Sequence, residues 1–233
     1  MKKIIYNIFD RSNFFRKLFK SYFLSRNIMI VNFFDKKRQE MLSFIKNPEL
    51  PINVTITQYE AYIVSMVTQA TAKLEGDIAE IGVYQGGSAR LICKYKGNKV
   101  FHLFDTFEGL PELNKYDTSN EFHKGQFSDT SFELIGKLLS GYQNVNIHRG
   151  YFPNTAGPVL DKKFSLVNLD VDLYKTTHDA LDFFYPRMVE GGIILSHDYV
   201  NADGVRKAFD DFFANKPEPI LIVSDTQCLV VKA

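Results

Sequence analysis

The sequence predicts an α/β fold in which a mostly parallel sheet is covered by helices on both faces and closed by an antiparallel hairpin. From about residue 57 onward, amphipathic segments alternate with short apolar runs, which is typical of parallel strands joined by right-handed helical crossovers. The hydrophobic fraction of 45%, with 21 phenylalanines and 12 tyrosines, is enough to fill a large core. Two apolar runs near the C-terminus, separated by residues 224–227, suit a closing hairpin.

Residues 1–50 differ in charge from the rest of the chain, and we expect them to form a helical extension of a main domain over residues 51–233. The first segment carries 11 Lys and Arg against 4 Asp and Glu, and the second carries 17 against 23. Aromatic residues recur at helical spacing over 15–23 with basic residues between them, and a second helix is expected over 35–45. This basic aromatic face would pack on the main domain or on a second subunit, or would contact an anionic membrane surface.

Helices and strands are expected to alternate along the main domain. Thr57 and Glu60 have the spacing of a helix capping box, and Gly76 ends the helix that follows. The polar stretch over residues 105–130 is too long for a simple connection, and loops of this length are often lids over active sites. The expected helices are 57–73, 88–96, 131–139, 176–185 and 203–213, and the expected strands are 77–83, 99–104, 145–148, 164–170, 192–197, 219–223 and 228–232.

Composition excludes several classes of protein. The acidic balance of the main domain argues against a nucleic-acid partner. No run reaches the roughly 18 apolar residues that a membrane-spanning helix needs, and the apolar run after Met1 breaks at residues 10–11, before it reaches the length of an export signal. Cys93 and Cys228 are too few and too distant for a disulfide scaffold or a zinc cluster. We therefore expect a cytoplasmic protein, with peripheral membrane contact through residues 1–50 as the alternative.

The candidate site residues lie where predicted strands end, because ligands of parallel α/β sheets bind beyond the carboxyl ends of the strands. Glycines in the turn after the first strand would let a ligand approach the backbone. Their spacing is not the G-x-G-x-x-G of dinucleotide sites, which disfavours a nicotinamide-dependent reductase. Asp105, at the end of the second strand, is placed to accept the hydroxyls of an adenosine ribose. The candidate residues of the glycine turn are Glu80, Gly82, Gly86, Gly87 and Ser88.

Five segments of the chain carry recognisable motifs. They are E-I-G-V-Y-Q-G-G-S (80–88), F-D-T-F-E-G-L-P (104–111), G-Y-F-P-N-T (150–155), L-D-V-D-L-Y (169–174) and G-G-I-I-L-S-H-D-Y (191–199). In this order they resemble the successive motifs of the macrocin O-methyltransferase (TylF-like) family. The resemblance runs from about Thr57 to the end of the chain. It implies a class I methyltransferase fold, Rossmann-like with a seven-stranded sheet, a homodimer, and methyl transfer from S-adenosylmethionine to a hydroxyl of a sugar or glycoconjugate.

The resemblance also implies roles for single residues. The glycine turn with Glu80 would hold the amino-acid half of S-adenosylmethionine, Asp105 would bind the ribose, and Gly150 and Tyr151 would lie near the adenine. The family's divalent metal, usually magnesium, would be held by the three residues Asp170, His197 and Asp198.

His197 departs from the family, which usually has an aspartate at this position. Magnesium prefers oxygen ligands, so a histidine would weaken the site or favour manganese, iron or zinc. The alternative is that His197 binds no metal and acts as a base, because its ordinary pKa lies near physiological pH.

Asp170 and His197 are the candidate catalytic residues. Methyl transfer from a sulfonium is an in-line displacement in which the acceptor must lose a proton, and a strand-end carboxylate such as Asp170 can collect it. The candidate substrate-binding residues are His123 in the long loop, Asp172 and Tyr174, although Asp172 could instead cap the helix that begins near residue 176.

Two other functions stay open at this point. One is an N-methyltransferase for an amino sugar, which would need no metal and would use His197 as its base. The other is a nucleoside-binding scaffold that has lost catalysis. Retention of Asp170 and Asp198 argues against the scaffold.

Overall fold

The computed structural model describes residues 36–118 and 122–233, so the predicted helix over 15–23 lies outside the described residues. The chain divides into two units, Met1–Gln39 and Glu40–Ala233, and the second contains the sheet. This unit begins before residue 51, the expected boundary, because Met41 and Ile45 of helix α3 (Lys36–Lys46) are buried in its core. No helix among the described residues is long and apolar enough to cross a membrane.

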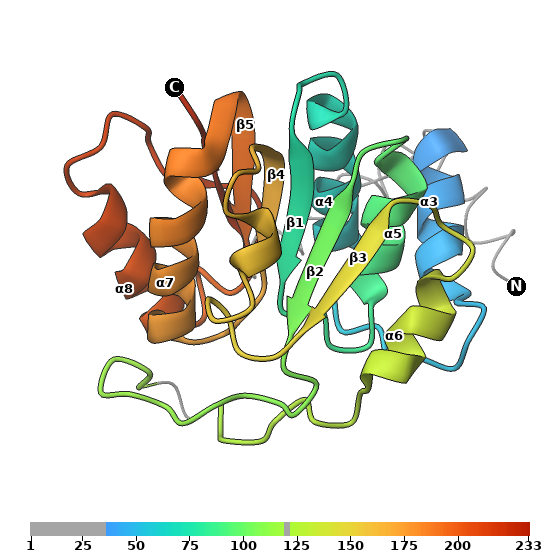
Figure 1. Cartoon of the computed structure of the whole chain (residues 1–233), viewed down its shortest axis with the longest axis horizontal. Helices are drawn as coiled ribbons and strands as arrows, with labels where there is room; N and C mark the ends of the chain where they lie inside the picture. The colour runs from blue at the N-terminus through green and yellow to red at the C-terminus, as the bar shows by residue number, and fades with distance from the viewer. Residues whose placement is uncertain (1–35, 119–121) are drawn as a thin grey trace, which may run out of the picture. The chain divides into compact units, whose positions relative to one another are not determined.

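Seven strands form one sheet in the order β3-β2-β1-β4-β5-β7-β6 (Figure 1). The first five strands pair in parallel, and β7 runs antiparallel to both β5 and β6. This arrangement confirms the predicted mostly parallel sheet with a closing hairpin. The strands are β1 (Asp77–Ile81), β2 (Phe101–Asp105), β3 (Val145–Arg149), β4 (Phe164–Leu169), β5 (Met188–Ser196), β6 (Leu221–Ile222) and β7 (Cys228–Val231).

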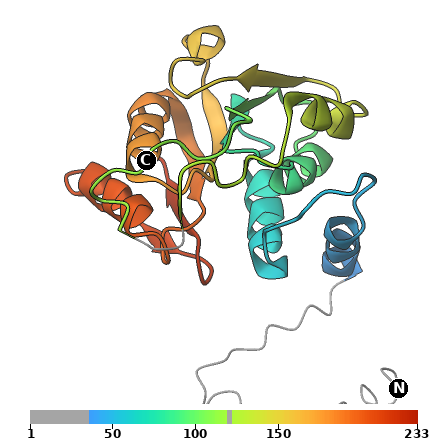
Figure 2. The same ribbon diagram turned by 90° about the horizontal axis from the view of Figure 1, so that it is seen from below.

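Helices cover both faces of the sheet (Figure 2). Successive strand residues point to opposite faces, so that Ile78 of β1 packs in one apolar cluster while Ala79 packs in the other. The cluster around Ile78 includes α3, α4 (Gln58–Thr71), α5 (Gly87–Tyr95) and α6 (Phe132–Leu139). The cluster around Ala79 includes α7 (Tyr174–Phe184) and α8 (Asp203–Phe213). Two short 3-10 helices complete the described elements, at Gly157–Val159 and Tyr185–Arg187.

The capping box predicted at the start of α4 is confirmed. The backbone N–H of Thr57 donates to Oε2 of Glu60 at 2.6 Å, and the N–H of Glu60 donates to the Thr57 hydroxyl at 3.3 Å. β5 begins at Met188, earlier than the predicted residue 192, and its register against β4 shifts between Phe164 and Leu166. The glycine pair at 191–192 therefore lies inside an irregular strand and does not mark its start.

The long loop over residues 105–130 passes below the sheet in Figure 1, beside the carboxyl ends of the strands. Its two halves pair with each other, since the N–H of Leu110 donates to the carbonyl of Gln126 and the N–H of Gly125 donates to the carbonyl of Leu110, each at 2.9 Å. Farther along the loop, Asp117 accepts a 2.7 Å hydrogen bond from the backbone N–H of Tyr174. This last bond ties the loop to α7.

Candidate active site

A cavity of about 430 Å³ lies at the carboxyl ends of β1, β2 and β4. The strand order reverses at β1, because β2 and β3 follow on one side of it and β4 and β5 on the other. Ligands of parallel α/β sheets bind at such a reversal. The volume is within the range of small-molecule sites, about 300–1,000 Å³. The lining residues are Thr55, Ile81, Gly82, Tyr84, Phe104, Asp105, Thr106, Gly109, Leu110, Pro111, Phe122, Gln126, Phe127, Gly150, Tyr151, Phe152, Asp170, Val171, Asp172, Thr176, His197, Asp198 and Asn201.

Gly82 brings the ends of β1 and β4 into contact at the floor of this cavity. Its φ is +83°, and a Cβ atom at this position would lie 1.8 Å from the carbonyl oxygen of Asp170. Next to it, the N–H of Asp170 donates to the carbonyl of Ile81 at 2.9 Å. Only glycine permits this approach, because any other residue would need both an unfavourable backbone conformation and a displaced neighbour.

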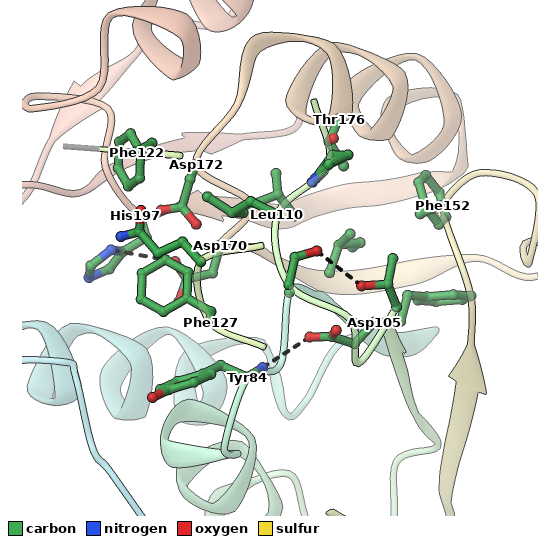
Figure 3. Close-up of a pocket in the computed structure, with 18 of the residues that line it drawn as sticks. Tyr84, Asp105, Leu110, Phe122, Phe127, Phe152, Asp170, Asp172, Thr176 and His197 are labelled. Carbon is green, nitrogen blue, oxygen red and sulfur yellow. Dashed lines mark hydrogen bonds and ion pairs between the residues drawn. The ribbon is translucent and has the colours of Figure 1, made fainter. Parts of the chain in front are cut away.

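Asp105 holds the backbone in place at one end of the cavity (Figure 3). Its Oδ2 atom accepts hydrogen bonds from the backbone N–H groups of Val83 at 2.7 Å and Tyr84 at 3.0 Å. Its Oδ1 atom accepts from the N–H of Phe107 at 2.7 Å. The N–H of Gly150 donates to the Asp105 carbonyl at 2.9 Å. Asp105 thus fixes the glycine turn against the end of β3, and Gly150 and Tyr151 line the cavity beside it.

The structure separates the five candidate residues of the glycine turn. Gly82 lines the cavity, whereas Glu80, Gly86, Gly87 and Ser88 do not. Glu80 is fully buried in β1 and accepts a 2.8 Å hydrogen bond from Nδ2 of Asn168. Burial raises the pKa of Glu80 to about 8, so this carboxyl group is largely protonated near neutral pH.

Asp170 and His197 lie together at the other end of the cavity (Figure 3), and Asp198 lies beside His197 in the same lining. Nδ1 of His197 lies 2.8 Å from Oδ2 of Asp198 and 3.5 Å from Oδ1 of Asp170. One ligand atom from each of the three residues can be chosen so that all lie within 4.8 Å of one another. Two carboxylates and one imidazole at this spacing are a donor set that suits manganese, iron or zinc better than magnesium.

Glu60 is a member of this group that the sequence analysis missed. Its Oε1 atom lies 3.3 Å from Nε2 of His197, a buried nitrogen that has no aligned hydrogen-bond partner among the described residues. The capping-box spacing already gave Glu60 a role at the start of α4. No sequence pattern indicated a contact between Glu60 and His197, the residue that follows β5. The pairing depends on how α4 packs against the sheet.

The charged groups strongly perturb one another. Burial alone would lower the pKa of His197, but Asp170, Asp198 and Glu60 together raise it to about 12. Burial raises the pKa of Asp170 to about 6 despite the nearby imidazole. For Asp198 and Glu60, the interaction with His197 outweighs burial and lowers the pKa, to about 2 in the case of Glu60.

Asp172 lines the cavity and does not cap α7. The residue that precedes the helix is Leu173, which provides no side-chain cap, and the first N–H of the helix is bound by Asp117 of the long loop. Asp172 is buried, and burial together with the carboxylates of Asp198 and Asp170 raises its pKa well above the usual range. The alternative interpretation of Asp172 as a helix cap is therefore wrong.

His123 and Tyr174 lie outside the cavity lining. His123 is exposed and its Nδ1 atom is 3.1 Å from the carbonyl oxygen of Lys124, and the Tyr174 hydroxyl donates to Asp211 at 3.1 Å. The long loop instead contributes apolar side chains to the lining, notably Phe122 and Phe127. Aromatic residues in an otherwise polar stretch were the sequence feature that could have identified these two lining residues. A role for His123 or Tyr174 in acceptor binding stays a prediction.

The lining combines aromatic surface with acidic groups. Among the described residues it contains four aspartates and one histidine, and neither Lys nor Arg. Aromatic and apolar side chains can pack against a base or sugar ring, while the carboxylates can accept hydrogen bonds from hydroxyl groups and bind cations. The cavity can therefore hold a nucleoside next to a hydroxyl-bearing molecule.

Comparison with known proteins gives matches to methyltransferases. The family model described as Macrocin-O-methyltransferase (TylF) matches residues 56–229. The 8-demethyl-8-(2,3-dimethoxy-alpha-L-rhamnosyl)-tetracenomycin-C 4'-O-methyltransferase of Streptomyces olivaceus is 30% identical over 154 residues, which are 59% of this chain and 58% of that protein. The demethyldecarbamoylnovobiocin O-methyltransferase of Streptomyces niveus is 24% identical over 153 residues, 60% of this chain and 58% of that protein. The match thus spans 58% of the length of each of these relatives, less than two thirds.

Solved structures share the fold. The O-methyltransferase NovP superposes with a TM-score of 0.62 at 20% identity, covering 76% of this chain and 82% of that one. The calicheamicin methyltransferase CalS11 gives a TM-score of 0.65 at 16% identity, covering 87% and 94%. At these identities the likeness concerns architecture, and it confirms the predicted class I methyltransferase fold.

Proposed function

The chain belongs to the macrocin-O-methyltransferase (TylF) family, and from this premise we propose that it transfers a methyl group from S-adenosylmethionine to a hydroxyl of a sugar or glycoconjugate. The observation that carries the proposal is the juxtaposition, in one cavity, of the turn held by Asp105 with the group formed by Asp170, His197 and Asp198. The name of the Streptomyces olivaceus relative, a 4'-O-methyltransferase of a rhamnosyl tetracenomycin, supports the same acceptor class.

The Asp105 end of the cavity is suited to the cofactor. Asp105 keeps acceptor capacity on Oδ1, which receives one backbone hydrogen bond, and could accept a ribose hydroxyl there. Tyr151 and Phe152 supply aromatic surface next to Gly150, where an adenine could pack. Gly82 lines the cavity between Asp105 and Asp170, where the amino-acid half of the cofactor would lie.

The Asp170 end of the cavity is suited to the acceptor. In the reaction, the acceptor oxygen forms a bond to the methyl carbon while the carbon–sulfur bond breaks, and the electron pair of that bond stays on sulfur. The hydroxyl proton must leave, and Asp170 is the residue we assign to receive it. Burial raises the pKa of Asp170 to about 6, which makes this carboxylate a better base than an exposed aspartate.

Asp170, His197 and Asp198 would also hold a divalent cation, since their ligand atoms fit within one coordination sphere. Such an ion, when bound, would orient the acceptor hydroxyl and lower its pKa. Asp198 is itself held by hydrogen bonds from Asn201 at 2.8 Å and from His197. The aromatic loop residues Phe122 and Phe127 would exclude water from this end of the cavity.

The test is a methyl-transfer assay with isotopically labelled S-adenosylmethionine and a panel of neutral glycosides, amino sugars and nucleotide sugars. We expect labelled product with a glycoside, and we expect Asp170→Asn to abolish turnover while the affinity for S-adenosylhomocysteine stays unchanged. Transfer only to amines would replace the proposal by the N-methyltransferase alternative. Unchanged turnover in D170N would refute the role of Asp170.

A further inference from the structure

Glu60 lies behind His197, outside the lining of the cavity, and faces the ring nitrogen that points away from Asp170 and Asp198. We infer that Glu60 is a positioning residue for His197: it binds the Nε2–H group so that Nδ1 presents its lone pair to a divalent cation held between Asp170 and Asp198. This inference rests on the proposed function, because it assigns how the site of that reaction would hold its cation.

The two nitrogens of the His197 ring have different neighbours. Nε2 lies 3.3 Å from Oε1 of Glu60, whereas Nδ1 lies 2.8 Å from Asp198 and 3.5 Å from Asp170. A neutral imidazole carries its proton on one nitrogen and a lone pair on the other. Carboxylates face both nitrogens and together favour a ring that is protonated on both. A cation bound by Asp170 and Asp198 would take the place of the Nδ1 proton, and Glu60 would keep the proton on Nε2. Histidines that bind metals commonly donate their second N–H to a carboxylate in this way.

Glu60 is held firmly enough to orient a ring. Its side chain is 2% exposed, its Oε2 atom accepts the N–H of Thr57, and its Oε1 atom accepts the hydroxyl of Thr226. Thr57 precedes α4 and Thr226 lies between β6 and β7, so two separate parts of the chain fix this carboxylate. A buried carboxylate without such partners would be costly.

The group as a whole has a surplus of negative charge that favours a cation. Three carboxylates, from Glu60, Asp170 and Asp198, surround one imidazole. A protonated His197 balances one of these charges, whereas a divalent ion that takes the place of its Nδ1 proton would balance two of them. Glu60 would thus contribute through both hydrogen bonding and charge, although it does not reach the ion itself.

The experiment is a titration of the full chain with MnCl₂, in which electron paramagnetic resonance measures the free ion and calorimetry measures the heat of binding. The variants are Glu60→Gln, which removes the charge, and Thr57→Ala, a control that breaks the same capping box but leaves the Glu60–His197 pair. Both are repeated in a His197→Asp background, where position 197 has no ring N–H for Glu60 to accept. S-adenosylhomocysteine is titrated into every variant.

We expect Glu60→Gln to weaken Mn²⁺ binding by about 10- to 100-fold, and Thr57→Ala to leave it unchanged. In the His197→Asp background, Glu60→Gln should no longer weaken Mn²⁺ binding. An equal loss in both backgrounds, an equal loss in Thr57→Ala, no loss in Glu60→Gln, or no Mn²⁺ binding by the unaltered chain would each overturn the inference. If the chain still binds S-adenosylhomocysteine in these cases, the inference fails and the proposed function is kept. If the unaltered chain does not bind S-adenosylhomocysteine, the proposed function is refuted independently of the inference.

Discussion

Replacing Gly82 by alanine tests whether the contact between β1 and β4 shapes the cavity. A Cβ at this position would lie 1.8 Å from the carbonyl oxygen and 2.7 Å from the carbonyl carbon of Asp170, at a φ of +83°. The unfavourable φ costs about 1 kcal/mol and the forced displacement of packed atoms about 1–3 kcal/mol, so the free energy of unfolding should fall by about 2–4 kcal/mol. Because the displaced group is the backbone of Asp170, the affinity for S-adenosylhomocysteine should fall as well.

Gly97→Ala is the matched control for this substitution. Gly97 also has a positive φ, +61°, but among the described residues, apart from its two chain neighbours, no atom lies within 4 Å of the position where its Cβ would be. Urea unfolding followed by circular dichroism should therefore show a loss of about 1 kcal/mol for Gly97→Ala, which reflects the backbone conformation alone. If the two variants lose the same stability and bind S-adenosylhomocysteine equally, the close approach of Gly82 to Asp170 does not shape the site.

Three further predictions concern Glu80, Asp105 and the N-terminal boundary. Burial raises the pKa of Glu80 from 4.5 to about 8, so between these pH values the folded chain keeps a proton that the unfolded chain has lost. The free energy of unfolding of the unaltered chain should therefore fall relative to that of Glu80→Gln as pH rises, by up to about 1.36 kcal/mol per pH unit; a difference independent of pH would contradict the raised pKa. Asp105→Asn removes a charged acceptor worth about 1.5–3 kcal/mol, so calorimetry should show a clear loss of S-adenosylhomocysteine affinity, and unchanged affinity would exclude Asp105 from the cofactor site. Deleting residues 1–50 should lower the thermal midpoint, because it removes the core residues Met41 and Ile45 of α3; an unchanged midpoint would place the boundary at residue 51.

The architecture was predictable because hydrophobic patterning and element length act locally. Apolar runs such as the one ending at Ile81 and the capping box at Thr57 need no knowledge of distant contacts. β5 was the exception: the glycine pair Gly191 and Gly192 predicted the start of the strand, but the strand begins at Met188, which pairs with Phe164 of β4. Tertiary pairing overrode a local signal there.

The site was predictable where its residues follow strands directly. Asp105, Asp170 and His197 each lie at a strand end, and parallel pairing brings such ends to one edge of the sheet. Glu60 was not predictable, because its meeting with His197 depends on helix packing across a separation of more than half the chain. The roles of the individual site residues, the homodimer and the cytoplasmic location stay predictions.

The measurement that tests the central claim most directly is a calorimetric titration of the full chain with S-adenosylhomocysteine, with NADH as the comparison ligand. Each titration is run with and without MnCl₂. We predict saturable binding of S-adenosylhomocysteine with one site per chain, and no binding of NADH. Binding of NADH alone, or of neither ligand, would contradict the assignment of this cavity to methyl transfer.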